Sequence, residues 1–193
     1  MDVSVDDRLN AWVAPRPAIT TLWQDITYAL QPLTWEVLAA LAAVVLWRVR
    51  RRKLALFVLL AIFGTVAWYN IVKAAVGRAR PTVPVPLLRA VGASFPSGHA
   101  MMSAVAMTLV AMGAWTLSRR LLARVAVIAA AVLIAAGVAF SRLALGVHYL
   151  SDVLGAWLLA AAWVLTLLAV FQPGRSRARR RRERRHQARV TAD

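Results

Sequence analysis

Residues 121–140 read LLARVAVIAAAVLIAAGVAF, and Arg124 is the only charged residue among these twenty. An α-helix needs about 20 apolar residues to cross the hydrocarbon core of a bilayer, which is about 30 Å thick. This stretch therefore predicts a transmembrane helix. Three further blocks meet the same condition of length and apolar composition, at residues 54–72, 98–117 and 150–171.

The overall composition favours a membrane protein over a soluble domain. Hydrophobic residues make up 61% of the 193-residue chain, whereas soluble domains contain about 45–50%. The formal net charge of +16 would indicate nucleic-acid binding in a soluble protein, but here the basic residues lie between apolar blocks or in the C-terminal tail. We therefore expect no nucleic-acid partner. The absence of cysteine excludes a disulfide framework, a thiol nucleophile and zinc-thiolate or iron–sulfur centres.

A fifth apolar block, at residues 33–47, is short and carries Glu36. We still predict that it spans the bilayer, because Pro32 favours a helix start and Trp35 and Trp47 are typical of the membrane interface. The expected fold class is therefore all-α, a polytopic transmembrane helix bundle with about five to six spans.

Residues 19–30 show a different pattern, because Gln24 and Asp25 interrupt the apolar residues. The apolar side chains recur at helical spacing on one side, which predicts an amphipathic helix in the membrane interface. A sixth, tilted span is the alternative. We accordingly divide the chain into an N-terminal tail with this helix (1–32), a transmembrane domain (33–172) and a basic tail expected to be disordered (173–193).

Basic residues predict the orientation of the bundle, because loops rich in Lys and Arg remain in the cytoplasm. Three basic clusters lie at residues 48–53, 119–124 and 175–189, and five spans place all three on that side. We expect the tail to bind anionic lipid head groups there. The opposite loops break the rule locally, which suggests that their basic residues serve a local purpose. These residues are Lys73, Arg78, Arg80, Arg89 and Arg142.

Three polar segments lie on this outer side, each at the end of a predicted span. They are KAAVGRARP at residues 73–81, FPSGH at 95–99 and SRLALGVHYLSD at 141–152. Ionisable groups at membrane depth are costly and tend to face a shared interior or cavity. We therefore expect the three segments to converge on one pocket.

The contents of such a pocket suit a phosphoryl group. Arg80 and Arg142 can bind phosphate oxygens in bidentate fashion, and Lys73 adds a point charge. Ser97 and Gly98 open an apolar helix, whose first turn offers unpaired backbone N–H groups to an anion. Ordinary helix capping by the serine is the alternative explanation for that pair.

His148 and Asp152 are four residues apart, so they share one face if the last helix begins near Gly146. The carboxylate would then fix the imidazole tautomer, leaving the other nitrogen free to attack phosphorus. His99 could protonate the leaving group. Taken singly, each of these residues has another explanation. His148 and Asp152 could form a purely structural pair, and Lys73 and Arg80 could extend to the outer lipid head groups. His99 could have a structural role or bind a metal ion. Their joint occurrence at three span ends favours one shared site.

The three segments closely resemble the signature motifs of the type 2 phosphatidic acid phosphatase superfamily, which includes vanadium haloperoxidases and bacterial undecaprenyl diphosphate phosphatases. The resemblance runs from about residue 73 to residue 157. The first motif matches Lys73 with Arg80 and Pro81, and the second matches residues 96–99. The third motif matches the following residues: Ser141, Arg142, His148 and Asp152.

This resemblance implies roles for the motif residues. Lys73, Arg80 and Arg142 would hold the phosphate with Ser97 and Gly98. His148, oriented by Asp152, would form a phosphoenzyme, and His99 would protonate the leaving group. No metal ion or other cofactor would be needed, because the cationic clamp would stabilise the transition state.

The implied enzyme is a lipid phosphatase at the outer face of a bacterial plasma membrane. Its substrate would be undecaprenyl diphosphate, phosphatidic acid or phosphatidylglycerol phosphate. Vanadate-dependent halide oxidation and non-catalytic binding or transport of lipid phosphates are the alternatives. Many membrane members resemble six-span bundles, whereas this chain has five convincing spans and an amphipathic segment. The sequence does not specify an oligomeric state.

Overall fold

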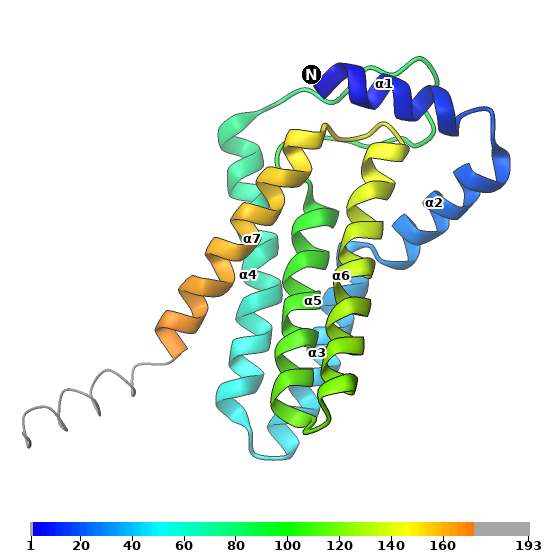
Figure 1. Ribbon diagram of the computed structural model, residues 1–193. Coiled ribbons are helices and arrows are strands. Elements are labelled where there is room, and N and C mark those ends of the chain that lie inside the picture. Colours follow the sequence, from blue (N-terminus) through cyan, green and yellow to red (C-terminus); the bar gives the residue numbers. More distant parts are fainter. Residues whose placement is uncertain (1, 172–193) are drawn as a thin grey trace, which may run out of the picture.

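The computed structural model describes residues 2–171, with side chains from residue 7 onwards. This part of the chain folds into seven α-helices and contains no strand (Figure 1). In chain order they are α1 (Asp2–Val13), α2 (Pro17–Ala29), α3 (Pro32–Arg48), α4 (Arg52–Val76), α5 (Gly98–Leu117), α6 (Leu121–Ala144) and α7 (Leu150–Phe171). The basic tail predicted at residues 173–193 lies outside the described residues.

Five stretches of the described chain are long and apolar enough to cross a membrane. Four of them are α4 to α7, with 20–25 residues each, and the first runs from Pro17 to Arg48 and so includes both α2 and α3. The all-α polytopic bundle expected from the sequence is therefore confirmed. Pro32 occupies the start of α3, where its missing N–H costs no helical hydrogen bond.

The long helices alternate in direction, so the loops gather at two ends (Figure 1). The loops at 49–51 and 118–120 lie at one end, next to the basic residues of the first two clusters. The loops at 77–97 and 145–149 lie at the other end, together with α1 and α2. The first two basic clusters and the polar segments therefore occupy opposite ends of the bundle.

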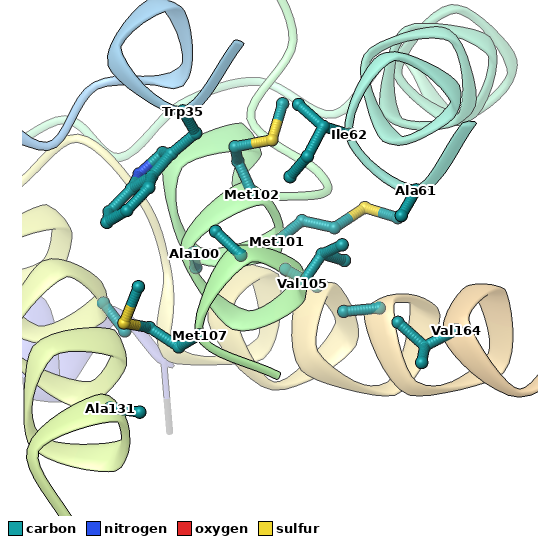
Figure 2. Packing of buried hydrophobic residues seen from close by; sticks show 14 of the residues in the cluster. Trp35, Ala61, Ile62, Ala100, Met101, Met102, Val105, Met107, Ala131 and Val164 are labelled. Carbon is teal, nitrogen blue, oxygen red and sulfur yellow. The ribbon is translucent and has the colours of Figure 1, made fainter. Parts of the chain in front are cut away.

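The core forms around α5, which packs against α3, α4, α6 and α7. Its buried side chains are small or unbranched, and Met101, Met102 and Val105 are all fully buried (Figure 2). Methionine fills irregular gaps because its unbranched side chain is adaptable. Large apolar side chains such as Leu133 and Leu158 are more than 70% exposed on the outside of the bundle. That apolar exterior suits lipid better than water.

Helices α4 and α7 approach closely at Gly64. A Cβ atom at this position would overlap the ring of Trp163. The indole Nε1 of Trp163 donates to the carbonyl oxygen of Ala61 at 3.1 Å, one turn before Gly64. A glycine is therefore required where the indole crosses α4.

The N-terminal segment is more ordered than the tail expected from its sequence. Residues 2–13 form α1, in which Asn10 is fully buried. The side chain of Asn10 donates to the carbonyl of Val85 at 2.8 Å and accepts from the N–H of Val85 at 3.2 Å. In α2, Gln24 donates to the carbonyl of Leu87 at 2.8 Å. The two N-terminal helices thus hold the loop between α4 and α5.

Helix α2 is inclined to the long helices and lies at the end of the bundle that carries the polar segments (Figure 1). It contacts α6, against which Thr27 is buried. A break at residues 30–31 separates α2 from α3. The interfacial position of α2 stays a prediction.

Candidate active site

The three polar segments meet around one cavity of about 340 Å³. Six of the eight residues expected from the sequence line it: Lys73, Arg80, Gly98, His99, Arg142 and His148. They come from the end of α4, the loop after it, the start of α5, the end of α6 and the turn before α7. The two remaining residues, Ser97 and Asp152, are fully buried next to Gly98 and His148. The expected convergence on one pocket is therefore confirmed.

His148 lies in a turn and not in a helix, which corrects one expectation from the sequence. Helix α7 begins at Leu150 instead of near Gly146, whose φ of 68° marks the turn. The pairing with Asp152 nevertheless forms, with His148 Nδ1 3.3 Å from Asp152 Oδ2. Asp152 sits in the first turn of α7 and also accepts the backbone N–H of Tyr149 at 3.0 Å. This bond follows the capping-box pattern, which places the carboxylate beside His148.

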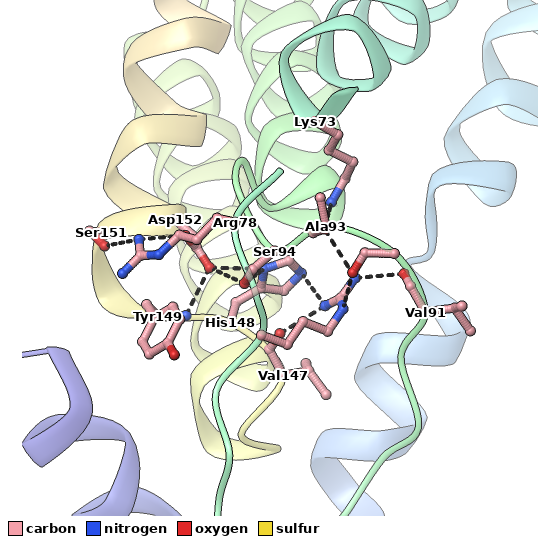
Figure 3. Close-up of polar contacts among 12 residues, drawn as sticks. Lys73, Arg78, Val91, Ala93, Ser94, Val147, His148, Tyr149, Ser151 and Asp152 are labelled. Carbon is pink, nitrogen blue, oxygen red and sulfur yellow. Dashed lines mark hydrogen bonds and ion pairs between the residues drawn. The ribbon is translucent and has the colours of Figure 1, made fainter. Parts of the chain in front are cut away.

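Two further residues, which the sequence did not single out as site residues, hold the carboxylate of Asp152 (Figure 3). Arg78 Nη1 donates to Oδ1 at 2.9 Å, and the hydroxyl of Ser94 makes a short hydrogen bond to Oδ2. Arg78 also donates to Ser151 Oγ at 2.6 Å. The sequence signal for Arg78 was its unexpected charge in an outer loop, whereas Ser94 carried no signal.

The second nitrogen of His148 faces Arg80. Arg80 Nη1 lies 3.3 Å from Nε2 of His148. Because a guanidinium can only donate, Nε2 must be the acceptor, and the proton must reside on Nδ1 beside Asp152. Burial lowers the pKa of His148 from 6.5 to about 4, in spite of the hydrogen bond to Asp152. The imidazole is therefore neutral near pH 7, with its lone pair on Nε2.

Backbone carbonyls orient two of the three expected cations. Lys73 Nζ donates to the carbonyl of Ala93 at 2.5 Å. Burial lowers the pKa of Arg80, yet a guanidinium remains charged at any ordinary pH. Arg80 donates to three backbone carbonyls at 2.8–3.0 Å, those of Val91, Gly92 and Val147. The loop and the turn thus fix the positions of these charges (Figure 3).

Arg142 is held from another direction, by α2. Its Nη1 donates to Thr27 Oγ1 at 3.1 Å, and Thr27 also shares a 2.7 Å hydrogen bond with Ser141. Arg142 is only 3% exposed, and its Nε has no partner among the described residues. Within residues 7–171 it forms no ion pair. A buried guanidinium without a carboxylate is costly unless an anion enters the cavity.

Ser97 does not cap α5, although it occupies the N-cap position. Its hydroxyl is buried and, within the described part of the chain, makes no hydrogen bond. The capping explanation considered for Ser97 and Gly98 is therefore wrong for the serine side chain. A buried hydroxyl, the unpaired N–H groups of a helix start and an unpaired arginine Nε together suit a tetrahedral oxyanion.

The PAP2 superfamily model matches residues 53–175 of this chain, which include all three polar segments. The chain belongs to the PAP2 superfamily. The resemblance inferred from the three motifs is thereby confirmed, and this PAP2 chain is a multi-pass membrane protein with a phosphatase fold.

One solved structure shows how far the PAP2 likeness extends. The crystal structure of a transmembrane PAP2-type phosphatidylglycerolphosphate phosphatase from Bacillus subtilis is 26% identical, with a TM-score of 0.68. The match covers 86% of this chain and 84% of that one. No curated protein sequence is significantly similar to this chain. The structural match extends over most of the chain and supports a phosphatase.

Proposed function

We propose that this PAP2 protein is a metal-independent phosphatase that removes phosphate from a membrane lipid through a phosphohistidine intermediate. The observation that carries the proposal is the pairing of His148 with Asp152 at 3.3 Å beside a cavity lined by cations. A neutral imidazole held by a carboxylate is an activated nucleophile. The cations around it provide the electrostatic stabilisation that metal ions supply in many other phosphatases.

The reaction has two steps. In the first, Nε2 of His148 attacks phosphorus while Lys73, Arg80 and Arg142 bind the phosphate oxygens together with Ser97 and the N–H of Gly98. The P–O bond to the lipid breaks, and His99 gives its proton to the departing oxygen. In the second, His99 takes a proton from water, water attacks phosphorus, and the P–N bond breaks to release phosphate. Asp152 stabilises the imidazolium in both steps.

The proposed substrate is a lipid phosphate or diphosphate, such as phosphatidylglycerol phosphate, undecaprenyl diphosphate or phosphatidic acid. Two observations support a lipid. The cavity lies at one end of an apolar bundle, and its lining includes Tyr28 of α2, Gln31 before α3 and Tyr69 of α4. The structural relative is a phosphatidylglycerolphosphate phosphatase.

We also propose that the chain resides in a bacterial plasma membrane with the site on the extracytoplasmic face. The loops with the basic residues at 48–53 and 119–124 lie at the end of the bundle opposite the loops at 77–97 and 145–149 (Figure 1), and the latter two loops contribute residues to the cavity lining. Loops with such charge remain in the cytoplasm. The substrate would therefore be taken from the outer leaflet.

Phosphate release from the candidate lipids in detergent tests the proposal, with EDTA present throughout. Wild-type protein should release phosphate and should form an acid-labile, alkali-stable phosphoenzyme in a rapid quench. His148→Gln should abolish both, because the amide cannot serve as a nucleophile. An exposed control, Asn70→Gln, should behave as wild type. Loss of activity in EDTA, or full activity of His148→Gln, would contradict the mechanism. Tight lipid binding without any turnover would favour a lipid-phosphate binder instead.

A further inference from the structure

A second cavity adjoins the one that contains His148. Its volume is about 530 Å³, and it includes Thr82, Gly146 and Val147 in its lining. The two cavities share a wall made of Arg80 and the loop residues Leu88, Arg89, Ala90 and Val91. The two charged residues in this shared wall are Arg80 and Arg89. A ligand group placed near this wall would therefore lie beside the phosphate that His148 attacks.

Arg89 differs from the other cations of the site. Lys73, Arg80 and Arg142 each donate hydrogen bonds to protein oxygen atoms. Arg89 is exposed and makes no hydrogen bond or ion pair with any other side chain or backbone group in the described chain. Its five N–H donors are free to bind a ligand in bidentate fashion.

The charge of the cavity also exceeds what one phosphate requires. Four cationic side chains line the cavity around His148, and none of its lining residues is acidic. A phosphate monoester carries a charge of about −1.5 to −2 near pH 7. A second anionic group on the ligand would match the remaining positive charge.

We propose that Arg89 binds a second anionic phosphorus group of the substrate, next to the phosphate that is cleaved. This inference rests on the proposed function and narrows it to lipids that carry two phosphorus groups. Such a lipid is either a diphosphate or a phosphomonoester joined to a phosphodiester. Arg89 is a specificity residue in this arrangement, and Lys73, Arg80 and Arg142 hold the reacting phosphate.

Binding of two small probes tests the inference without turnover. Methylenediphosphonate carries two phosphorus groups and is not hydrolysed, whereas methylphosphonate carries one. In nonionic detergent, wild-type protein should bind the first more tightly, and Arg89→Gln should weaken that binding by about tenfold or more, as expected for a charged hydrogen bond. The affinity of Arg89→Gln for methylphosphonate should differ from that of wild type by less than about twofold, because methylphosphonate has no second phosphorus group for Arg89 to bind.

Arg8→Gln is the matched control, because Arg8 is also exposed and lies on α1 at the same end of the molecule. It should leave the binding of both probes unchanged. Equal weakening of both probes in Arg89→Gln, or weakening of neither, would overturn the inference. Arg89→Gln could instead weaken the binding of both probes equally, and only when anionic lipid is added. That result would overturn the inference and indicate that Arg89 binds the membrane surface.

Turnover provides the second arm of the test. Arg89→Gln should raise KM for phosphatidylglycerol phosphate by about tenfold and leave KM for phosphatidic acid with the same acyl chains unchanged. If wild-type protein hydrolyses both lipids and Arg89→Gln does not discriminate between them, only the inference about Arg89 fails. If neither lipid is hydrolysed while the diphosphonate binds as expected, the proposed catalytic function fails and the binding site stands.

Discussion

Arg78 binds the carboxylate of Asp152 from the side opposite His148, with Nη1 2.9 Å from Oδ1, while Nδ1 of His148 lies 3.3 Å from Oδ2. The carboxylate is fully buried and Arg78 is about one-third exposed. Its guanidinium also stacks over the ring of Tyr149, 4.1 Å from the centroid. Arg78 therefore links the carboxylate to the turn that carries His148, and we regard it as a positioning residue.

Arg78→Gln should lower kcat by about tenfold, because the change removes a charged hydrogen bond to Asp152. It should also move the acidic limb of the pH–rate profile to higher pH. With the neighbouring cation gone, the negative charge of Asp152 stabilises protonated His148 more effectively. Arg78→Lys should restore part of the activity and return the limb towards its wild-type position. A lower kcat with an unmoved limb would indicate a purely structural role.

Wild-type activity should persist at pH values where an ordinary histidine is protonated. Burial lowers the pKa of His148 from 6.5 to about 4, so the nucleophile stays neutral across that interval. Profiles of kcat/KM against pH should show an acidic limb well below 6.5. A limb near 6.5 would show that His148 titrates as an exposed histidine.

The same depressed pKa has a consequence for stability. The unfolded chain binds a proton at His148 near pH 6.5 and the folded chain only near 4, so stability should fall as pH decreases through that window. Tm in detergent should therefore drop between pH 6.5 and 4. His148→Gln should show a smaller drop over the same interval, and an equal drop in the two proteins would contradict the assignment.

Gly64→Ala should destabilise the bundle, because the added methyl group would meet the indole ring of Trp163. Overpacking of this kind costs about 1–3 kcal/mol. Gly113→Ala is the matched control, since a Cβ at Gly113 meets nothing within 4 Å. That change should be neutral or slightly stabilising, as alanine is the better helix former. Thermal unfolding in detergent would compare them, and equal Tm values would refute the close approach.

Asn10→Ala should loosen the loop over the cavity. The buried amide makes two partly buried hydrogen bonds with the backbone of Val85, and their joint loss costs about 1–3 kcal/mol. We expect a higher KM, since the loop carries the carbonyls that orient Lys73 and Arg80. Thr166→Ala removes an exposed hydroxyl that donates to the carbonyl of Ala162 and does not line the cavity, and it should leave KM unchanged. An unchanged KM for Asn10→Ala would show that α1 does not support the loop.

The spans and the motif residues could be predicted because the membrane makes both conspicuous. A bilayer fixes the length of an apolar helix, and buried charges such as Arg142 are rare enough there to indicate a site. Helix α7 coincides with the predicted apolar block, residues 150–171, although its start near Gly146 was not correctly predicted. No feature of the sequence pattern indicated that Thr27 binds Arg142.

The missed features depend on contacts between distant parts of the chain. Arg78 and Ser94 reach Asp152 across 74 and 58 residues, and no local pattern encodes such pairings. Helix α1 is short and polar, so its order derives from packing and from the bonds of Asn10 to a loop 75 residues away. His148 lies outside the helix because Asp152 accepts the backbone N–H of Tyr149 and so caps the start of α7. The sequence pattern indicated Asp152 only as a partner of the His148 imidazole.

The family match begins at residue 53, yet part of the wall of the cavity around His148 belongs to an earlier stretch of the chain. Thr27 and Tyr28 of α2 and Gln31 before α3 line the same space as both histidines. Residues before the family match thus help to shape the cavity. A chimera that carries the first 48 residues of another PAP2 protein should consequently keep the reaction and change KM for its lipid substrate.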